Sequence, residues 1–194
     1  MIGKKRLDNI HYCAEQIIKN NIEGDFIEAG VWRGGATIFM KAIIKAYGLD
    51  KKIFVADSFE GLPKPNIEKY PDDKGDIEHK WDYLKVSLDD VKNNFRRFGL
   101  LDDEVIFLKG WFKDTLYTNK IGKLSLVRLD GDMYESTWDS LNALYPKLEK
   151  GGYLIIDDYY NNKGCRNAVM DYFKQEKLNH EIIQIDWTGA YFKK

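Results

Sequence analysis

The chain alternates between short apolar runs and longer stretches in which apolar residues recur every three or four positions. The apolar runs predict seven strands, at residues 25–31, 52–58, 104–110, 124–130, 152–158, 181–187 and 190–194. The periodic stretches predict five helices, at residues 5–20, 35–47, 88–98, 136–148 and 163–176. Several strands are almost continuously apolar, which is typical of strands that are covered on both faces.

This alternation of strands and helices predicts an α/β fold, with a mostly parallel seven-stranded sheet and helices on both faces. The last two strands are separated only by Thr188 and Gly189, so they are expected to form an antiparallel hairpin at the C-terminal end. A chain of 194 residues suits a single domain over 1–194.

One segment, residues 62–85, does not follow either pattern. It contains three of the four prolines and many charges, without a clear period. Irregular segments of this length in a compact domain are usually functional or disordered. Because the segment follows the end of the second predicted strand, we interpret it as a lid over a binding site.

The composition narrows the class of protein. The net charge of −1 argues against a broad surface for nucleic acid or anionic membranes, so no nucleic-acid partner is expected. No apolar run approaches the roughly 20 residues that cross a bilayer. No signal peptide is visible, so the expected location is cytoplasmic. Cys13 and Cys165 match no redox or metal spacing and are expected to be buried free thiols.

The stretch "GDFIEAGVWRGGATIFMKAI" (24–43) predicts a strand, a glycine-rich turn and a helix. It does not match the phosphate-binding P-loop, because Ala36 stands where that motif needs lysine. It does not match the dinucleotide motif either, because Trp32 replaces the second glycine. The turn therefore favours a ligand without phosphates.

S-adenosylmethionine is such a ligand, since a carboxylate can meet its ammonium group while glycines allow close approach. The residues that fit this interpretation are Glu28, Gly30, Gly34 and Gly35. Asp57, at the end of the second strand, is placed to accept the ribose hydroxyls of an adenosine. The alternatives are that the glycines only form a tight turn and that Asp57 only caps a loop.

Pairs of acids follow two later strands, Asp130 with Asp132 and Asp157 with Asp158. If these strands are neighbours, about 4.8 Å apart, the carboxylates converge at one edge of the sheet. Clustered carboxylates without histidine or cysteine favour a hard cation such as Mg²⁺. The alternative is that some of these acids cap helices.

Several long motifs closely resemble the macrocin O-methyltransferase family. They are "DFIEAGVWRGGAT", "VADSFEGLPKP", "LDDVKNNFRRFGLLDDEVIFLKGWFKDTL", "RLDGDMYESTWDSLNALYPKLEKGGYLIIDDY" and "GCRNAVMDYF", in the same order and spacing over residues 25–191. The resemblance implies a class I (Rossmann-like) methyltransferase fold, bound S-adenosylmethionine, and Mg²⁺ held by aspartates.

The resemblance also implies roles for individual residues. In the cofactor site it implies Glu28, Gly30 and Ala36 in the glycine loop, Asp57 and Ser58 at the ribose, and Gly110, Trp111 and Phe112 near the adenine. It implies that Asp130, Asp157 and Asp158 hold the metal, with Asp130 also the catalytic base. Asp132 lies in the same motif, and its role as ligand or base is left open.

The expected reaction is methyl transfer to a hydroxyl of a sugar, a sugar-containing natural product or a polysaccharide precursor. The acceptor and the assembly into a homo-oligomer are left open. The alternatives are a metal-dependent hydrolase, an NAD-dependent sugar-modifying enzyme and a non-catalytic adenosine-binding module.

Overall fold

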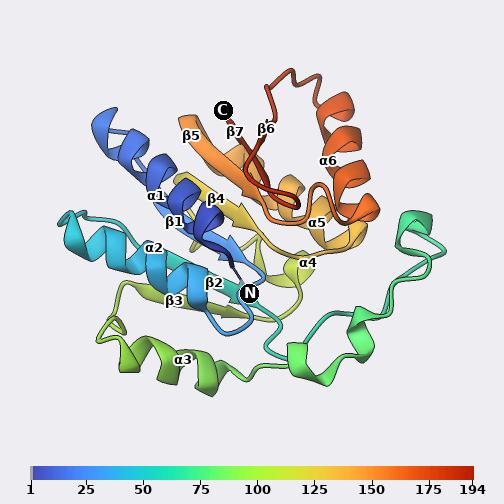
Figure 1. Ribbon diagram of the computed structural model, residues 1–194, viewed down its shortest axis with the longest axis horizontal. Helices are drawn as coiled ribbons and strands as arrows, with labels where there is room; N and C mark the ends of the chain where they lie inside the picture. The colour runs from blue at the N-terminus through green and yellow to red at the C-terminus, as the bar shows by residue number, and fades with distance from the viewer. Residues whose placement is uncertain (1) are drawn as a thin grey trace.

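The computed structural model describes residues 2–194, and its centre is one seven-stranded sheet in the order β3-β2-β1-β4-β5-β7-β6 (Figure 1). The strands are β1 (Asp25–Ala29), β2 (Ile53–Asp57), β3 (Val105–Lys109), β4 (Leu124–Leu129), β5 (Leu148–Ile156), β6 (Ile183–Gln184) and β7 (Ala190–Lys193). Strands β1 to β5 are parallel, and β7 pairs antiparallel with both β5 and β6. The predicted α/β fold and its C-terminal antiparallel hairpin are confirmed.

Helices cover both faces of the sheet (Figure 1). They are α1 (Lys4–Lys19), α2 (Gly35–Ala46), α3 (Leu88–Arg97), α4 (Phe112–Thr115), α5 (Tyr134–Leu144) and α6 (Lys163–Gln175). Neighbouring strand residues point to opposite faces. Phe26 therefore packs in the core shared with α1, α2 and α3, whereas Ile27 packs in the core shared with α5 and α6.

The predicted helix 136–148 is shorter in the structure. Helix α5 ends at Leu144, and a 3₁₀ turn that contains Pro146 leads directly into β5 at Leu148. Proline lacks the N–H that would continue the helix. Strand β5 therefore begins four residues before the predicted start at 152, and Leu148 already pairs with Leu124 of β4.

The insertion at 62–85 is irregular but anchored. It forms three 3₁₀ turns, Pro71–Asp73, Glu78–Lys80 and Asp82–Leu84. The buried carboxylate of Asp73 accepts hydrogen bonds from the N–H groups of Tyr134 (2.6 Å) and Glu135 (3.0 Å) at the start of α5. The segment is thereby tied to the loop that follows β4, and its role as a lid stays a prediction.

The structure also bears on the expectations about membrane spans and about the two cysteines. Among the helices of residues 2–194, none combines the length and apolar character that a membrane span requires. Cys13 and Cys165 are both buried and free, as predicted.

Candidate active site

A cavity of about 660 Å³ opens at the carboxyl ends of the parallel strands. This is the edge where open α/β sheets bind their ligands. The predicted site residues that line it are Glu28, Gly30, Gly35, Ala36, Asp57, Ser58, Gly110, Trp111, Phe112, Asp130, Asp132, Asp157 and Asp158. Gly34 is the one predicted site residue outside this lining. The fold thus brings the glycine loop and the acids to one place.

The floor of the cavity is a close contact between the loops after β1 and β4. Gly30 has a φ of +89°, and a Cβ added there would lie 1.7 Å from the carbonyl oxygen of Asp130. The Asp130 N–H donates to the Ala29 carbonyl at 2.8 Å. Only glycine suits this position, because it tolerates positive φ and adds no side chain.

The two glycines at the start of α2 have different tasks. Gly34, with a φ of +80°, faces α3, where an added Cβ would lie 3.1 Å from Val91 Cγ1. A Cβ added at Gly35 would meet no described atom within 4 Å. The left-handed backbone of Gly34, together with its close packing on α3, favours glycine there, and Gly35 leaves the side of the cavity open to a ligand.

Asp57 fastens the loops around the cavity. One carboxylate oxygen accepts the N–H groups of Val31 (2.8 Å) and Trp32 (3.1 Å), and the other accepts the N–H of Phe59 (2.8 Å) and the hydroxyl of Ser58 (3.3 Å). Burial raises the pKa of Asp57, and these N–H donors oppose the rise. Its predicted contact with a ribose stays a prediction.

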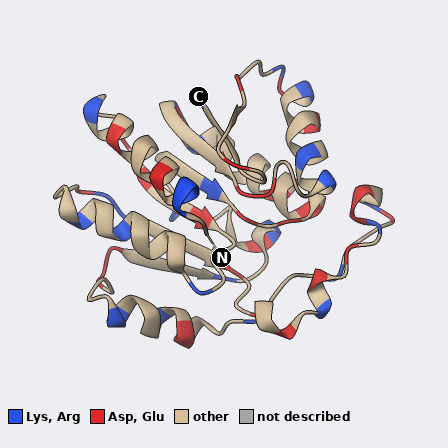
Figure 2. Ribbon diagram, in the orientation of Figure 1, with Lys and Arg blue, Asp and Glu red and all other residues tan. Residues whose placement is uncertain are grey.

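Three acids converge on one point after β4 and β5, where Figure 2 shows acidic positions along the loops. One carboxylate oxygen from each of Asp130, Asp132 and Asp158 lies within 4.8 Å of the other two. Oδ2 of Asp158 is buried and has no hydrogen-bond partner in the part of the chain that the structure describes. Burial, together with the neighbouring carboxylates, raises the pKa of Asp132 and of Asp158 well above the ordinary value. An all-oxygen donor set with an unpartnered buried oxygen fits a hard divalent cation.

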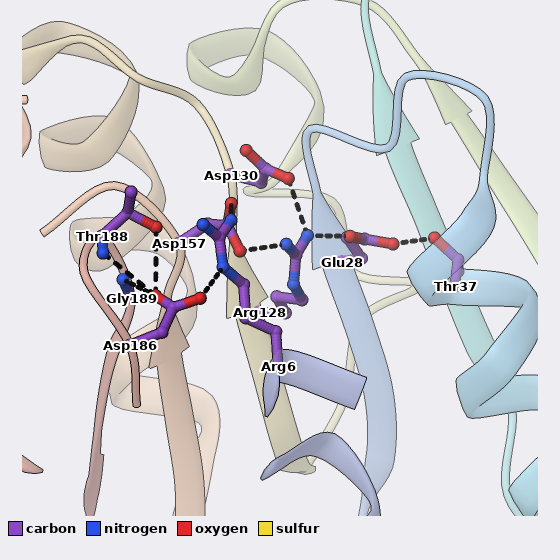
Figure 3. Close-up of polar contacts among 9 residues, drawn as sticks. All are labelled: Arg6, Glu28, Thr37, Arg128, Asp130, Asp157, Asp186, Thr188 and Gly189. Atoms are coloured by element: carbon purple, nitrogen blue, oxygen red, sulfur yellow. Dashed lines mark hydrogen bonds and ion pairs between the residues drawn. The ribbon is translucent and has the colours of Figure 1, made fainter. Parts of the chain in front are cut away.

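Asp157 lies beside this cluster and is held by two arginines (Figure 3). One of its oxygens accepts from Arg128 and the other from Arg6. Burial and Asp130 raise the pKa of Asp157, and the two arginines oppose the rise. The structure thus gathers Asp132 with Asp130 and Asp158, and it places Asp157 in an ion-pair network.

Arg128 is the centre of that network. Its guanidinium is 2% exposed and donates to Glu28, to Asp157 and, at 2.8 Å, to Asp130. Sequence reasoning did not identify Arg128 as a site residue. The signal was a single charge in the mostly apolar strand "LSLVRL", since a fully buried arginine is almost always paired.

Glu28 is also engaged within the protein. Its two oxygens accept from Arg128 and from the Thr37 hydroxyl. Burial raises the pKa of Glu28 to about 7, although Arg128 and Thr37 act against that rise. The predicted contact between Glu28 and the ammonium group of a ligand stays a prediction.

Arg6 and Asp186 were not predicted either, and they connect distant segments. Arg6 of α1 donates to Asp157 and, through Nε at 2.8 Å, to Asp186 in the turn between β6 and β7. Asp186 also accepts the N–H groups of Thr188 (3.0 Å) and Gly189 (2.8 Å). These bonds hold the hairpin turn against the acid side of the cavity (Figure 3).

Replacing Asp186 by asparagine is expected to lower the free energy of unfolding at pH 7 by roughly 1.5–3 kcal/mol, the usual contribution of hydrogen bonds to a charged group. Burial alone would raise the pKa of Asp186, but Gly189, Thr188 and Arg6 lower it to about 2. Because the pKa is about 3.9 in the unfolded chain, this stabilisation is complete above about pH 4 and is lost as the pH falls toward 2.

Urea unfolding of the wild type and Asp186→Asn between pH 7 and pH 3 measures this difference, which should narrow below about pH 4. The matched control is Asp8→Asn, because Asp8 forms an exposed pair with Lys4 on the same helix as Arg6. A difference in unfolding free energy between the wild type and Asp186→Asn that stays constant over this pH range would contradict the lowered pKa of Asp186.

The fold, with its cavity at the strand ends, is that of an O-methyltransferase. One solved structure, of the O-methyltransferase NovP, superposes with a TM-score of 0.97 at 47% identity and covers all of this chain and 81% of that one. The chain belongs to the macrocin O-methyltransferase (TylF) family, whose model matches residues 1–194.

Curated relatives agree with this assignment. Demethyldecarbamoylnovobiocin O-methyltransferase of Streptomyces niveus is 47% identical over all of this chain and 75% of its own length. Mycinamicin III 3''-O-methyltransferase of Micromonospora griseorubida is 45% identical over all of this chain and 78% of its own length. A tetracenomycin 4'-O-methyltransferase of Streptomyces olivaceus, named for a rhamnosyl substrate, is 47% identical over all of this chain and 74% of its own length.

Proposed function

We propose that this protein transfers a methyl group from S-adenosylmethionine to a hydroxyl of a sugar, with Mg²⁺ bound at the acid cluster. The observation that carries the proposal is that Asp130, Asp132 and Asp158 share one cavity with the open glycine turn at Gly35. The names of the relatives support a glycosylated small molecule, such as a rhamnoside, as the acceptor.

The cofactor would lie across the carboxyl ends of β1, β2 and β3. The open side at Gly35 admits it, and Ser58, Trp111 and Phe112 line the part of the cavity where its nucleoside would bind. The bound cofactor supplies a methyl group on a positively charged sulfur. The chain's own contribution is to hold that group and the acceptor hydroxyl in line and to exclude water.

Asp130 and Asp158 are the metal ligands that both the resemblance and the observed cluster support. Asp132 is the third carboxylate in reach, and Asp157 would join by exchanging a contact with Arg128 or Arg6. A bound Mg²⁺ would polarise the acceptor hydroxyl and lower its pKa. Asp130 or Asp132 would then accept the hydroxyl proton as a general base.

The insertion at 62–85 would act as the lid of this site. Leu62, Pro63 and Leu84 line the cavity, and Asp73 fastens the segment to α5. Exclusion of water by such a segment strengthens the electrostatic interactions inside the site.

Two measurements test the proposal. S-adenosylhomocysteine is titrated into the protein by calorimetry, once with Mg²⁺ and once with EDTA. Binding is expected in both, because the residues proposed to hold the nucleoside follow β2 and β3, whereas the clustered acids follow β4 and β5. Methyl α-L-rhamnoside is then incubated with S-adenosylmethionine and Mg²⁺, and mass spectrometry should detect a product with one added methyl group. The same incubation with EDTA in place of Mg²⁺ should give no methylated product. Absence of S-adenosylhomocysteine binding in both conditions would overturn the proposal.

A further inference from the structure

Trp187 is a large apolar side chain with no packing role that accounts for its position. It lies in the turn between β6 and β7 and is 76% exposed, more than any other large apolar residue that the structure describes. It also lines the cavity that holds the acids. An exposed indole that lines a binding cavity is available to a bound ligand, and burial of an aromatic ring is strongly favourable.

The backbone beneath Trp187 is held firmly. Asp186 accepts hydrogen bonds from the N–H groups of Thr188 and Gly189 and pairs with Arg6. On the other side, the carbonyl of Thr188 accepts the Tyr160 N–H at 2.8 Å, two residues after Asp158. The indole therefore lies on a turn that is hydrogen-bonded directly to the loop after β5, which carries Asp158.

The strand order sets the position of Trp187 along the cavity. The residues assigned to the nucleoside follow β2 and β3, the acids follow β4 and β5, and Trp187 lies between β7 and β6. Because neighbouring strands are about 4.8 Å apart, the order across the sheet is nucleoside side, acids, indole. The indole thus lies beyond the acids, on the side away from the cofactor.

We propose that Trp187 is the platform on which the aglycone of the acceptor stacks, that is, the flat apolar group attached to the sugar. The inference rests on the proposed function, in which the reacting sugar hydroxyl lies at the acids. Whatever is linked to that sugar then extends past β5 toward the hairpin and meets the indole. A flat aromatic surface on a rigid turn favours a flat apolar or aromatic group over a small polar one.

Two probes that share one sugar test this assignment: methyl α-L-rhamnoside and p-nitrophenyl α-L-rhamnoside. Their dissociation constants are measured by calorimetry with S-adenosylhomocysteine and Mg²⁺ present. The wild type is expected to bind the aryl glycoside about tenfold more tightly, the affinity equivalent of an aromatic contact. Trp187→Ala should remove this preference and leave the affinity for methyl rhamnoside within about twofold. Trp187→Phe should retain part of it.

The matched control is Phe98→Ala, because Phe98 is 69% exposed but does not line the cavity. It should keep the full aryl preference. No aryl preference in the wild type, or one that survives in Trp187→Ala, would overturn the inference while leaving the proposed function in place. Failure of the wild type to bind either glycoside, with S-adenosylhomocysteine still bound, would overturn the sugar acceptor and this inference together.

Discussion

Replacing Arg128 by methionine is expected to lower the free energy of unfolding by about 3–5 kcal/mol, the cost of breaking a buried ion pair. The variant leaves three carboxylates, Glu28, Asp130 and Asp157, without the cation that they share. Because the Arg128 guanidinium also positions Asp130 and Asp157, the rate of methyl transfer should fall together with the free energy of unfolding. Urea unfolding followed by circular dichroism gives the change in free energy.

Lys41→Met is the matched control. Lys41 is also 2% exposed, but its partners Asp102 and Glu104 are about half exposed and can be hydrated again once the cation is removed. A loss in Arg128→Met no larger than in Lys41→Met would contradict this account. The double variant Glu28→Gln with Arg128→Met should recover part of the stability, because it removes one of the unpaired charges.

The sheet and most helices could be predicted because their pattern is local. Ser87, for example, accepts the Asp90 N–H at 3.1 Å, so the predicted start of α3 is confirmed. The start of β5 was missed, because four further residues extend the strand beyond its apolar core as soon as Pro146 ends the helical segment. The turns of the insertion depend on Asp73 reaching α5, a distant contact that no local pattern encodes.

In the site, too, features that depend on local sequence could be predicted, and features that depend on distant contacts could not. Acids after neighbouring parallel strands must meet at one edge, so the convergence of Asp130 and Asp158 could be predicted from their places after β4 and β5. The bond between Arg6 and Asp157 could not, since these two residues are separated by 151 residues and meet only through the tertiary fold. Sequence alone locates the acids but does not tell which acid a nearby arginine already holds.

Asp158→Asn is expected to lower both the affinity for Mg²⁺ and the rate of methyl transfer by at least about 100-fold. Mutating a residue that only hydrogen-bonds to a metal ligand typically lowers metal affinity or activity 10–100-fold. Asp158 would hold the ion directly, so its loss should cost at least as much. Affinity for S-adenosylhomocysteine should stay within about twofold, because Asp158 follows β5, whereas the residues proposed to hold the nucleoside follow β2 and β3. Calorimetry with MgCl₂ and a coupled methyltransferase assay provide these values.

Without Mg²⁺, the same variant should melt at a higher temperature than the wild type. The substitution replaces one of three crowded carboxyl groups by a neutral amide, and Oδ2 of Asp158 has no described partner to lose. Asp103→Asn, an exposed acid before β3, is the control and should change neither property. An unaltered Mg²⁺ affinity in Asp158→Asn would remove this residue from the metal site.

The contact between Gly30 and the Asp130 carbonyl limits how this protein can be redesigned. Because there is no room between the two loops, a substitution at Gly30 that aimed to change preference for the proposed cofactor would also displace the backbone of Asp130. The two properties are therefore not separable there, and libraries that randomise the floor should yield mostly inactive variants. For the proposed acceptor, diversification belongs at Trp187 and at Leu62, Pro63 and Leu84, which line the cavity outside that contact.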